Sequence, residues 1–279
     1  MITASAPASS ANLGPGFDVI ALALGVRAEV TVEMAEGWEV VGVDGLADED
    51  LQALVWGVAG AAPPHRVTVS SEIPIARGLG SSAALRVAAA AALEASSGET
   101  RLERVLRTAA AAEGHADNVA AAVHGGLVLV GPAGQVRKIA LHPALVAVVA
   151  VPDHELATPE ARAALPEQVS RQVAVRTAAR LAFLVEGLRT GDPEALAAAA
   201  GDEVHEEPRS PLSPVSSELM VAARRGGALH ACWSGAGPSV LALATEDSAD
   251  AVRRAFEDVL GVHGSVLEPP VDREGVRVG

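Results

Sequence analysis

A glycine-rich stretch with two serines, residues 74–84, contains the residue types best suited to chemistry. It joins a predicted strand to a run of alanine and leucine that favours a helix. The first turn of a helix has unpaired backbone N–H groups and a partial positive charge, so this position suits an anion such as phosphate. Gly78 and Gly80 lack a Cβ and allow the backbone to approach that anion closely. The hydroxyls of Ser81 and Ser82 could cap the helix, bind phosphate oxygens or ligate a metal ion.

This stretch is neither of two common phosphate-binding motifs. A Walker A loop has a lysine before its Ser or Thr, and the only lysine of the chain is Lys138. The G-x-G-x-x-G spacing of the dinucleotide fingerprint is also missing. An ordinary capped helix after a glycine turn explains the stretch equally well on its own. Other parts of the sequence are therefore needed to choose between these interpretations.

Two other stretches place polar side chains where a ligand could bind. Residues 8–18 are rich in turn formers and contain Asn12 and Asp18, although Asp18 could equally cap a helix. Residues 113–119 form a polar cluster between two apolar helices. Buried polar groups need partners, so this cluster either caps helices or faces a ligand.

The composition of the 279-residue chain argues against several classes of function. A formal net charge of −14 disfavours nucleic acid or an anionic membrane as partner, and the six aromatic residues cannot form a platform for stacked bases. No apolar run approaches the length of a membrane-spanning helix, and we expect no secretory signal. The single Cys232 excludes an internal disulfide and suits a reducing compartment. We therefore expect a cytoplasmic protein.

The order of predicted elements indicates the α+β class, with antiparallel hairpins and with helices grouped on one side. Strands at residues 26–34 and 38–43 are expected to pair as a hairpin. The apolar, β-branched run at residues 145–151 predicts a strand covered on both faces. A proline and polar residues follow this run, so we expect two domains, comprising residues 1–152 and 153–279.

Three motifs in this order resemble those of the GHMP kinases, and the resemblance covers nearly the whole chain. They are the Leu-Gly-Pro-Gly-Phe-Asp loop within residues 9–18, the Pro-x₃-Gly-Leu-Gly-Ser-Ser-Ala-Ala loop of residues 74–84, and Ser-Gly-Ala-Gly-Pro-Ser at residues 234–239. The middle motif is specific, and the three together are very specific. Within that family, Glu-Gly-His-Ala-Asp-Asn at residues 113–118 looks like the Glu-Gly-His-Pro-Asp-Asn signature of the homoserine kinases.

The resemblance implies a fold and an activity. The fold is the two-domain GHMP kinase fold, with an N-terminal mixed α/β domain that carries a left-handed βαβ-type phosphate loop and a C-terminal ferredoxin-like α+β domain. The activity is transfer of the γ-phosphate of ATP to the hydroxyl of L-homoserine in threonine biosynthesis, with Mg²⁺, in a protein that often dimerises. The alternatives are a GHMP kinase for mevalonate or a sugar, and a GHMP-fold protein that binds a metabolite without turnover.

The resemblance also assigns roles to single residues. Ser82, or its neighbour Ser81, is expected to hold Mg²⁺ with Glu113, and Trp56 or aliphatic residues could form the adenine pocket. Many GHMP kinases have an Asp where this chain has Asn118, and Asn cannot act as a base, so we expect no dedicated carboxylate base. The residues expected to wrap the phosphates are Pro74, Ile75, Ala76, Arg77, Gly78, Leu79, Gly80, Ser81, Ser82, Ala83 and Ala84. The residues expected to bind homoserine are Asn12, Asp18, His115, Asn118, Arg162, Arg209 and Gly235.

A free amino acid as substrate requires a cation for its carboxylate and an anion for its ammonium group. Arg162 and Arg209 can provide the first and Asp18 the second, although a surface ion pair is the commoner fate of an arginine. The family has Gln-Pro-Tyr where this chain has Glu206 and Glu207 followed by a proline. Two carboxylates beside a carboxylate-binding arginine are unfavourable unless they point away.

Overall fold

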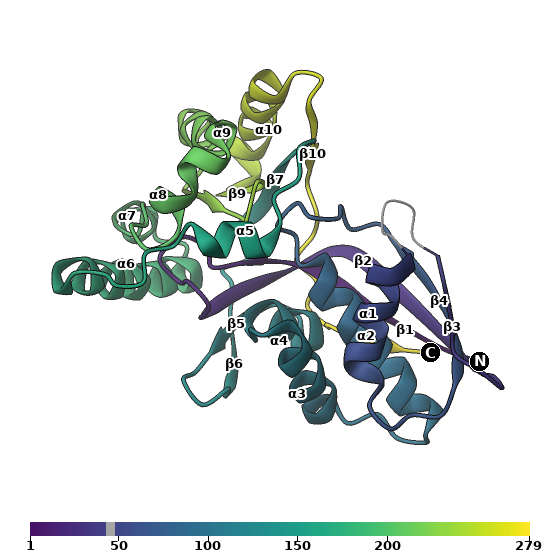
Figure 1. The fold of residues 1–279 in the computed structure, drawn as a ribbon. Coiled ribbons are helices and arrows are strands. Elements are labelled where there is room, and N and C mark those ends of the chain that lie inside the picture. Colours follow the sequence, from purple (N-terminus) through teal and green to yellow (C-terminus); the bar gives the residue numbers. More distant parts are fainter. Residues whose placement is uncertain (43–47) are drawn as a thin grey trace.

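The computed structural model describes residues 1–42 and 48–279, which fold around two β-sheets (Figure 1). In the first sheet the strands lie in the order β11-β1-β2-β4-β3, and β5 joins β2 to β6. Its strands are β1 (Ile2–Ala11), β2 (Ile20–Met34), β3 (Glu39–Val41), β4 (His65–Ser71), β5 (Leu127–Val130), β6 (Val136–Ile139) and β11 (Arg277–Val278). The second sheet consists of β7 (Val146–Pro152), β8 (His230–Trp233), β9 (Val240–Ala244) and β10 (Gly264–Leu267).

The helix that follows the glycine-rich loop, α2 (Ser81–Ser96), is the centre of the N-terminal half. It packs against β1 and β2 on one side and against three helices on the other. Those helices are α1 (Asp48–Ala59), α3 (Leu102–Glu113) and α4 (Asp117–His124). Eleven of the sixteen residues of α2 are buried, and seven of these are alanines, as expected of a helix inside the core. Because alanine is small, the sheet and the neighbouring helices can approach this helix closely, which fixes the position of its N-terminus.

The C-terminal half has the strand order β10-β7-β9-β8, in which every neighbouring pair is antiparallel. Along the chain this is a βαββαβ arrangement, so the predicted ferredoxin-like topology is confirmed. The helices α9 (Pro214–Arg225) and α10 (Glu246–Leu260) cover one face of the sheet around Phe256. Between β7 and α9 lie the helices α5 (Thr158–Ala163), α6 (Arg171–Thr190), α7 (Pro193–Ala198) and α8 (Glu206–Arg209) and a 3₁₀ turn at Ser210–Leu212.

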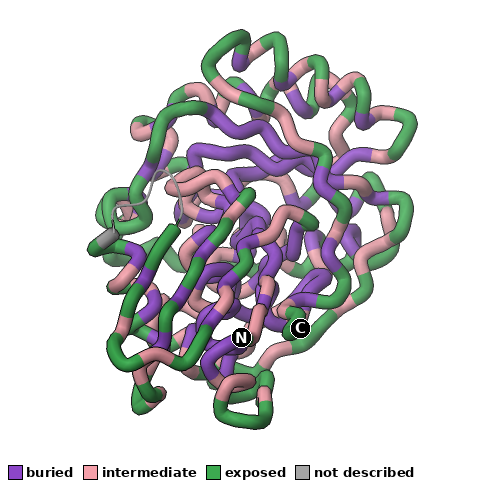
Figure 2. The backbone as a smooth tube through the Cα atoms, turned by 90° about the vertical axis from the view of Figure 1, so that its right-hand side faces the viewer, coloured by how far each residue is buried: buried purple, intermediate pink, exposed green. Residues whose placement is uncertain are grey.

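Strand β7 is buried on both faces, as its uninterrupted apolar sequence predicts. Val148 and Ala150 belong to the core under α9 and α10, whereas Ala147 and Val149 belong to the larger core that contains α2. In Figure 2 the buried segments run through the middle of the molecule, whereas β3 and β4, toward one edge of the first sheet, alternate between buried and exposed residues. The two halves therefore share a continuous apolar contact. Among the described residues, no helix is both long and apolar enough to cross a bilayer.

The predicted hairpin between residues 26–34 and 38–43 is wrong. Strand β2 pairs instead with β4, antiparallel, and β3 pairs in parallel with the other edge of β4. Residue 43 of the predicted hairpin lies outside the described residues. The reason is that α1 buries Leu51 and Val55 and has to cover the sheet, so the chain crosses over between β3 and β4. This β3-α1-β4 unit precedes the glycine-rich loop, and its predicted left-handedness stays a prediction.

The expected division between residues 152 and 153 does not follow the sheets. It separates β7 from the four-stranded sheet to which it belongs, because an apolar run fits the core of either sheet. The chain also returns to the first sheet at its end, where β11 pairs with β1. Asp272, just before β11, forms an ion pair with Arg27 of β2 and accepts hydrogen bonds from the backbone N–H groups of Glu274 and Gly275. The end of the chain is thereby fixed on the N-terminal half.

Replacing Asp272 by alanine is expected to destabilise the fold by about 2 kcal/mol. The change leaves the partly buried Arg27 without its carboxylate and removes the acceptor of two backbone N–H groups. Urea unfolding followed by circular dichroism measures the free energy of unfolding. Glu274→Ala is the matched control, because Glu274 pairs with the exposed Arg277 and its loss is expected to cost less than about 0.5 kcal/mol. Equal losses in the two variants would contradict this assignment.

Candidate active site

The carbonyl groups and the N–H groups of the glycine-rich loop differ in their hydrogen bonds. Every carbonyl from residue 76 to residue 80 accepts a hydrogen bond, in turn from Leu156 N, Ser239 N, Ser234 Oγ, Ser9 N and Ala84 N. The N–H groups of residues 77–83, in contrast, have no acceptor among the described residues. Seven successive donors at the start of a buried helix form a site for an anion with several oxygens.

The two glycines of the loop are required by close contacts with other motifs. Gly78 and Gly80 have φ angles of 76° and 67°, which side chains rarely adopt. A Cβ on Gly78 would lie 2.2 Å from the carbonyl oxygen of Ser234, and one on Gly80 would lie 2.4 Å from Ser9 Oγ. The loop is therefore held directly against the first and the third sequence motifs.

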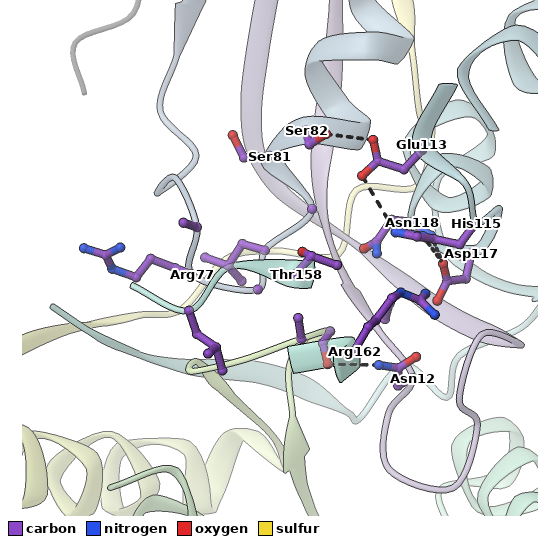
Figure 3. A pocket seen from close by; sticks show the side chains of 18 of the residues that line it. Asn12, Arg77, Ser81, Ser82, Glu113, His115, Asp117, Asn118, Thr158 and Arg162 are labelled. Atoms are coloured by element: carbon purple, nitrogen blue, oxygen red, sulfur yellow. Dashed lines mark hydrogen bonds and ion pairs between the residues drawn. The ribbon is translucent and has the colours of Figure 1, made fainter. Parts of the chain in front are cut away.

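Ser82, at the start of α2, meets Glu113, at the end of α3, as Figure 3 shows. Ser82 Oγ donates a hydrogen bond of 2.7 Å to Glu113 Oε2, which also forms an ion pair with Arg86. Arg86 Nη1 lies 2.9 Å from Ser82 Oγ as well. One hydroxyl and one carboxylate are oxygen ligands of the kind that Mg²⁺ takes beside phosphate groups. Ser81, the alternative ligand, lines the same pocket.

The polar cluster after α3 is satisfied internally. Asp117 Oδ1 accepts hydrogen bonds from Asn118 N, at 2.9 Å, and from His115 Nδ1, at 3.0 Å. Burial alone would lower the pKa of His115, but the hydrogen bond and charge of Asp117 outweigh it, so the pKa is raised above 6.5. The side-chain oxygen of Asn118 accepts from Ser9 Oγ at 2.8 Å, so its amide nitrogen is the group left for a ligand.

Opposite charges line the far end of the pocket. Arg162 from α5 binds Asp18 through two hydrogen bonds, of 2.8 and 3.2 Å. Asn12 holds this region together, because its amide nitrogen donates to Gly235 O and its oxygen accepts from Asp18 N. Asn12 and Asp18 both adopt positive φ angles, a strain typical of positions that a site requires.

Arg209 is a buried cation without a carboxylate partner among the described residues. Only 1% of its surface is exposed, and its hydrogen bonds go to Ala161 O, Gly235 O and His205 Nδ1. Burial and the nearby Arg162 lower its pKa to about 10, so it stays charged near neutral pH. Buried charges are normally paired, and an unpaired one therefore indicates an anionic ligand.

One pocket collects most of the residues that the sequence predicted. Its lining includes Asn12, Asp18, Pro74, Ala76, Arg77, Gly78, Leu79, Gly80, Ser81, Ser82, Glu113, His115, Asn118, Arg162, Arg209 and Gly235. Ala83 and Ala84 are buried in the core instead, and Ile75 lines a neighbouring apolar pocket. The guanidinium of Arg77 points away from the phosphate loop, toward Asp153 O and Glu155.

Sequence reasoning did not select several residues that line or support the pocket. Phe17 and Asp117 lie inside the quoted motifs, so their positions were available as a signal. Phe17 lies 5.5 Å from the guanidinium carbon of both Arg162 and Arg209, which orients these cations. Leu156, in contrast, carries no pattern of its own and reaches the pocket only through the fold.

The acidic pair beside Arg209 points away from the pocket. Glu206 accepts a hydrogen bond of 2.7 Å from Trp233 N in the core, and Glu207 is exposed. Burial raises the pKa of Glu206 to about 8. Its carboxyl group is therefore largely protonated and uncharged near pH 7. The two glutamates that replace the family's residues here thus place no negative charge beside Arg209.

The family models for the GHMP kinases match both halves of the chain. The N-terminal domain model matches residues 49–126 and the C-terminal model matches residues 184–261. The chain belongs to the GHMP kinases, and it has their two-domain fold.

Full-length relatives narrow this class. A homoserine kinase of Deinococcus radiodurans is 38% identical over 99% of this chain and 96% of that protein. One of Nostoc punctiforme is 36% identical over 99% and 97%. The crystal structure of a homoserine kinase from Cytophaga hutchinsonii matches with a TM-score of 0.88 at 29% identity, over 100% of this chain and 97% of that one. Within the GHMP kinases, the chain is a member of the homoserine kinase family.

Glu206→Gln is expected to make the protein more stable at alkaline pH. The folded protein keeps the proton up to a pH of about 8, whereas the unfolded chain releases it near 4.5, so the wild type loses stability as pH rises between these values. Glutamine keeps an uncharged acceptor for Trp233 N and removes the loss. We expect equal stability near pH 5 and a gain on the order of 2 kcal/mol near pH 8, measured by denaturant unfolding. Glu207→Gln, at the exposed neighbour, is the control, and a gain independent of pH would contradict the assignment.

Proposed function

We propose that the protein transfers the γ-phosphate of ATP to the side-chain hydroxyl of L-homoserine, giving O-phospho-L-homoserine. The observation that carries the proposal is one pocket lined at one end by residues 77–82, whose backbone N–H groups have no acceptor among the described residues, and at the other by the Asp18–Arg162 pair with Arg209. The first end suits a triphosphate and the second suits a small zwitterion. The family membership supports the same reaction.

The nucleotide would lie across the start of α2. Its phosphate oxygens would accept hydrogen bonds from the backbone N–H groups of residues 77–82, which would take the place of the lysine of a Walker A loop. An apolar pocket beside Ser81 and Ser82 is a suitable place for the base, lined by Ala53 and Leu54 of α1 and by Ile75 and Leu85. Trp56, the sequence-based candidate, is exposed and does not line this pocket, so aliphatic residues are the better candidates.

The residues present fit a magnesium ion that arrives with ATP. Ser82 Oγ and Glu113 Oε2 lie 2.7 Å apart beside the free N–H groups, and both are oxygen ligands. The described residues contain no group of three or more His, Cys, Asp or Glu placed to hold a metal. Mg²⁺ commonly takes one or two protein oxygens and completes its shell with phosphates and water. When bound, it would neutralise the charge of the phosphates.

The homoserine end is built from groups with complementary charge. Arg162 and the unpaired Arg209 would bind the carboxylate, and Asp18 would bind the ammonium group. His115 and Asn118 lie between this end and the phosphate loop, where the acceptor hydroxyl has to lie. The substrate hydroxyl would then be aligned with the γ-phosphate, and alignment supplies much of the rate in phosphoryl transfer.

We propose that no carboxylate base takes part. Asn118 cannot accept the hydroxyl proton, and Asp117 is engaged with His115 and with Asn118 N. The homoserine hydroxyl would pass its proton to the phosphate or to water. A cytoplasmic location and a homodimer stay predictions from the sequence.

The assay that tests the function measures ADP release from purified protein with ATP and MgCl₂. The acceptors are L-homoserine, mevalonate, galactose and none, and ³¹P NMR identifies the product. We expect ADP release and a phosphomonoester with homoserine only. Turnover with mevalonate or galactose alone would support a different GHMP kinase, and ATP binding without turnover on any acceptor would support a metabolite-binding protein.

Asn118→Asp is expected to lower kcat at least about tenfold between pH 6 and 9. The variant adds a negative charge where the negatively charged γ-phosphate has to approach, and the reaction does not need the base that it supplies. Steady-state kinetics across this pH range measure the effect, and Asn118→Ala separates the lost amide from the added charge. A large gain in kcat would show that the reaction is limited by removal of the proton.

A further inference from the structure

Arg86, a residue that neither the sequence motifs nor the pocket for homoserine includes, lies at the proposed metal site. It is one helical turn after Ser82 on α2 and faces the C-terminal end of α3. Its guanidinium contacts both proposed metal ligands, through an ion pair with Glu113 Oε2 and a hydrogen bond of 2.9 Å with Ser82 Oγ. A fixed positive charge thus lies on the carboxylate oxygen that a magnesium ion would use.

The contact is buried and only partly satisfied. The side chains of Arg86 and Glu113 are 17% and 10% exposed, so solvent screens their interaction weakly. Arg86 Nε is buried without a hydrogen-bond partner among the described residues. Arg86 also lines the apolar pocket beside Ser81 and Ser82, which is the region proposed for the nucleotide base. Arg86 thus lies between the two proposed metal ligands and the pocket proposed for the nucleotide base.

Arg86 offsets the negative charge of Glu113 at the proposed nucleotide site. Without Arg86, the carboxylate of Glu113 would face the phosphates of a nucleotide with only the ring of His115 beside it, whose Nε2 lies 3.8 Å from Glu113 Oε1, in a chain of net charge −14. Two negative charges that lie close together in a region of low dielectric constant repel each other strongly. Arg86 cancels the charge of Glu113 before any metal is present. An incoming metal ion must then compete with Arg86 for Glu113.

We propose that Arg86 is a resident cation of the nucleotide site. It positions Ser82 and Glu113 and allows nucleotide to bind before or without the metal, so that the metal increases nucleotide affinity only modestly. The proposal rests on the proposed ATP site and does not depend on which acceptor is phosphorylated.

The test compares the affinity of the full-length protein for ADP in EDTA and in MgCl₂, measured by isothermal titration calorimetry. The ratio of interest is the dissociation constant in EDTA divided by that in MgCl₂, and it is expected to be small in the wild type. In Arg86→Met we expect this ratio to rise at least about tenfold. Without the arginine, the charge of Glu113 weakens ADP binding in EDTA, while binding with Mg²⁺ is largely kept. Arg86→Lys keeps the charge and is expected to lie between the two. Circular dichroism establishes that each variant is folded.

Two further variants separate charge from packing. Arg104→Met removes the other ion pair between α2 and α3, with Glu94, away from the pocket, and is expected to leave the ratio unchanged. In the double variant Arg86→Met/Glu113→Gln the negative charge is gone, so ADP affinity in EDTA is expected to return toward that of the wild type.

An unchanged ratio in Arg86→Met would overturn the proposal and leave Arg86 as a packing residue. So would a loss of ADP affinity that is equal in EDTA and in MgCl₂. A wild type that binds no ADP under either condition would overturn the proposed nucleotide site together with this inference. A negative homoserine assay, in contrast, bears on the acceptor alone, since this experiment contains no acceptor.

Discussion

The hydrogen bonds that hold the carbonyl groups of residues 76–80 are the constraint on which the site depends. They come from β1, from the loop between β8 and β9, from the segment after β7 and from α2. Each of these carbonyl groups shares a peptide plane with the N–H group of the next residue. If the carbonyl groups turned, the N–H groups of the loop would turn with them and the anion site would be lost. Both sheets therefore have to be in place before the loop has its conformation. This explains why the three distant motifs occur together. Two of them, the loops at residues 74–84 and 234–239, contact each other and are both rich in glycine.

The protein binds anions in spite of its charge. A net charge of −14 gives no general attraction for a polyanion, and the loop contains no lysine. Backbone N–H groups provide a positive potential that is fixed in direction and adds no titratable group. Arg162 and Arg209 lie at the other end, where the guanidinium carbon of each is 5.5 Å from the centre of the Phe17 ring. The loop end of the pocket thus offers mainly backbone N–H groups, with Arg86 beside it, and the other end offers guanidinium groups.

The sequence predicts local features of this protein better than long-range pairing. The glycine loop, α2 and the polar cluster were recognisable because residue types at fixed spacing determine their backbone. The partner of β2 was not, since alternation in residues 26–34 shows that one face is buried and not which strand lies beside it. The same limit applies to β7, whose apolar run suits either sheet. Arg86 reaches the neighbouring pocket through packing, and no motif marks it.

The pairing of Asp18 with Arg162 gives a physical reason for selecting a zwitterion. In the structure the two groups satisfy each other through two hydrogen bonds while remaining more than one-third exposed. A ligand that offers only a carboxylate would take Arg162 and leave Asp18 without a partner, next to a second negative charge. An amino acid offers both an ammonium group and a carboxylate, so each half of the pair exchanges one ion pair for another. Mevalonate lacks the ammonium group, and Asp18 would therefore oppose its binding.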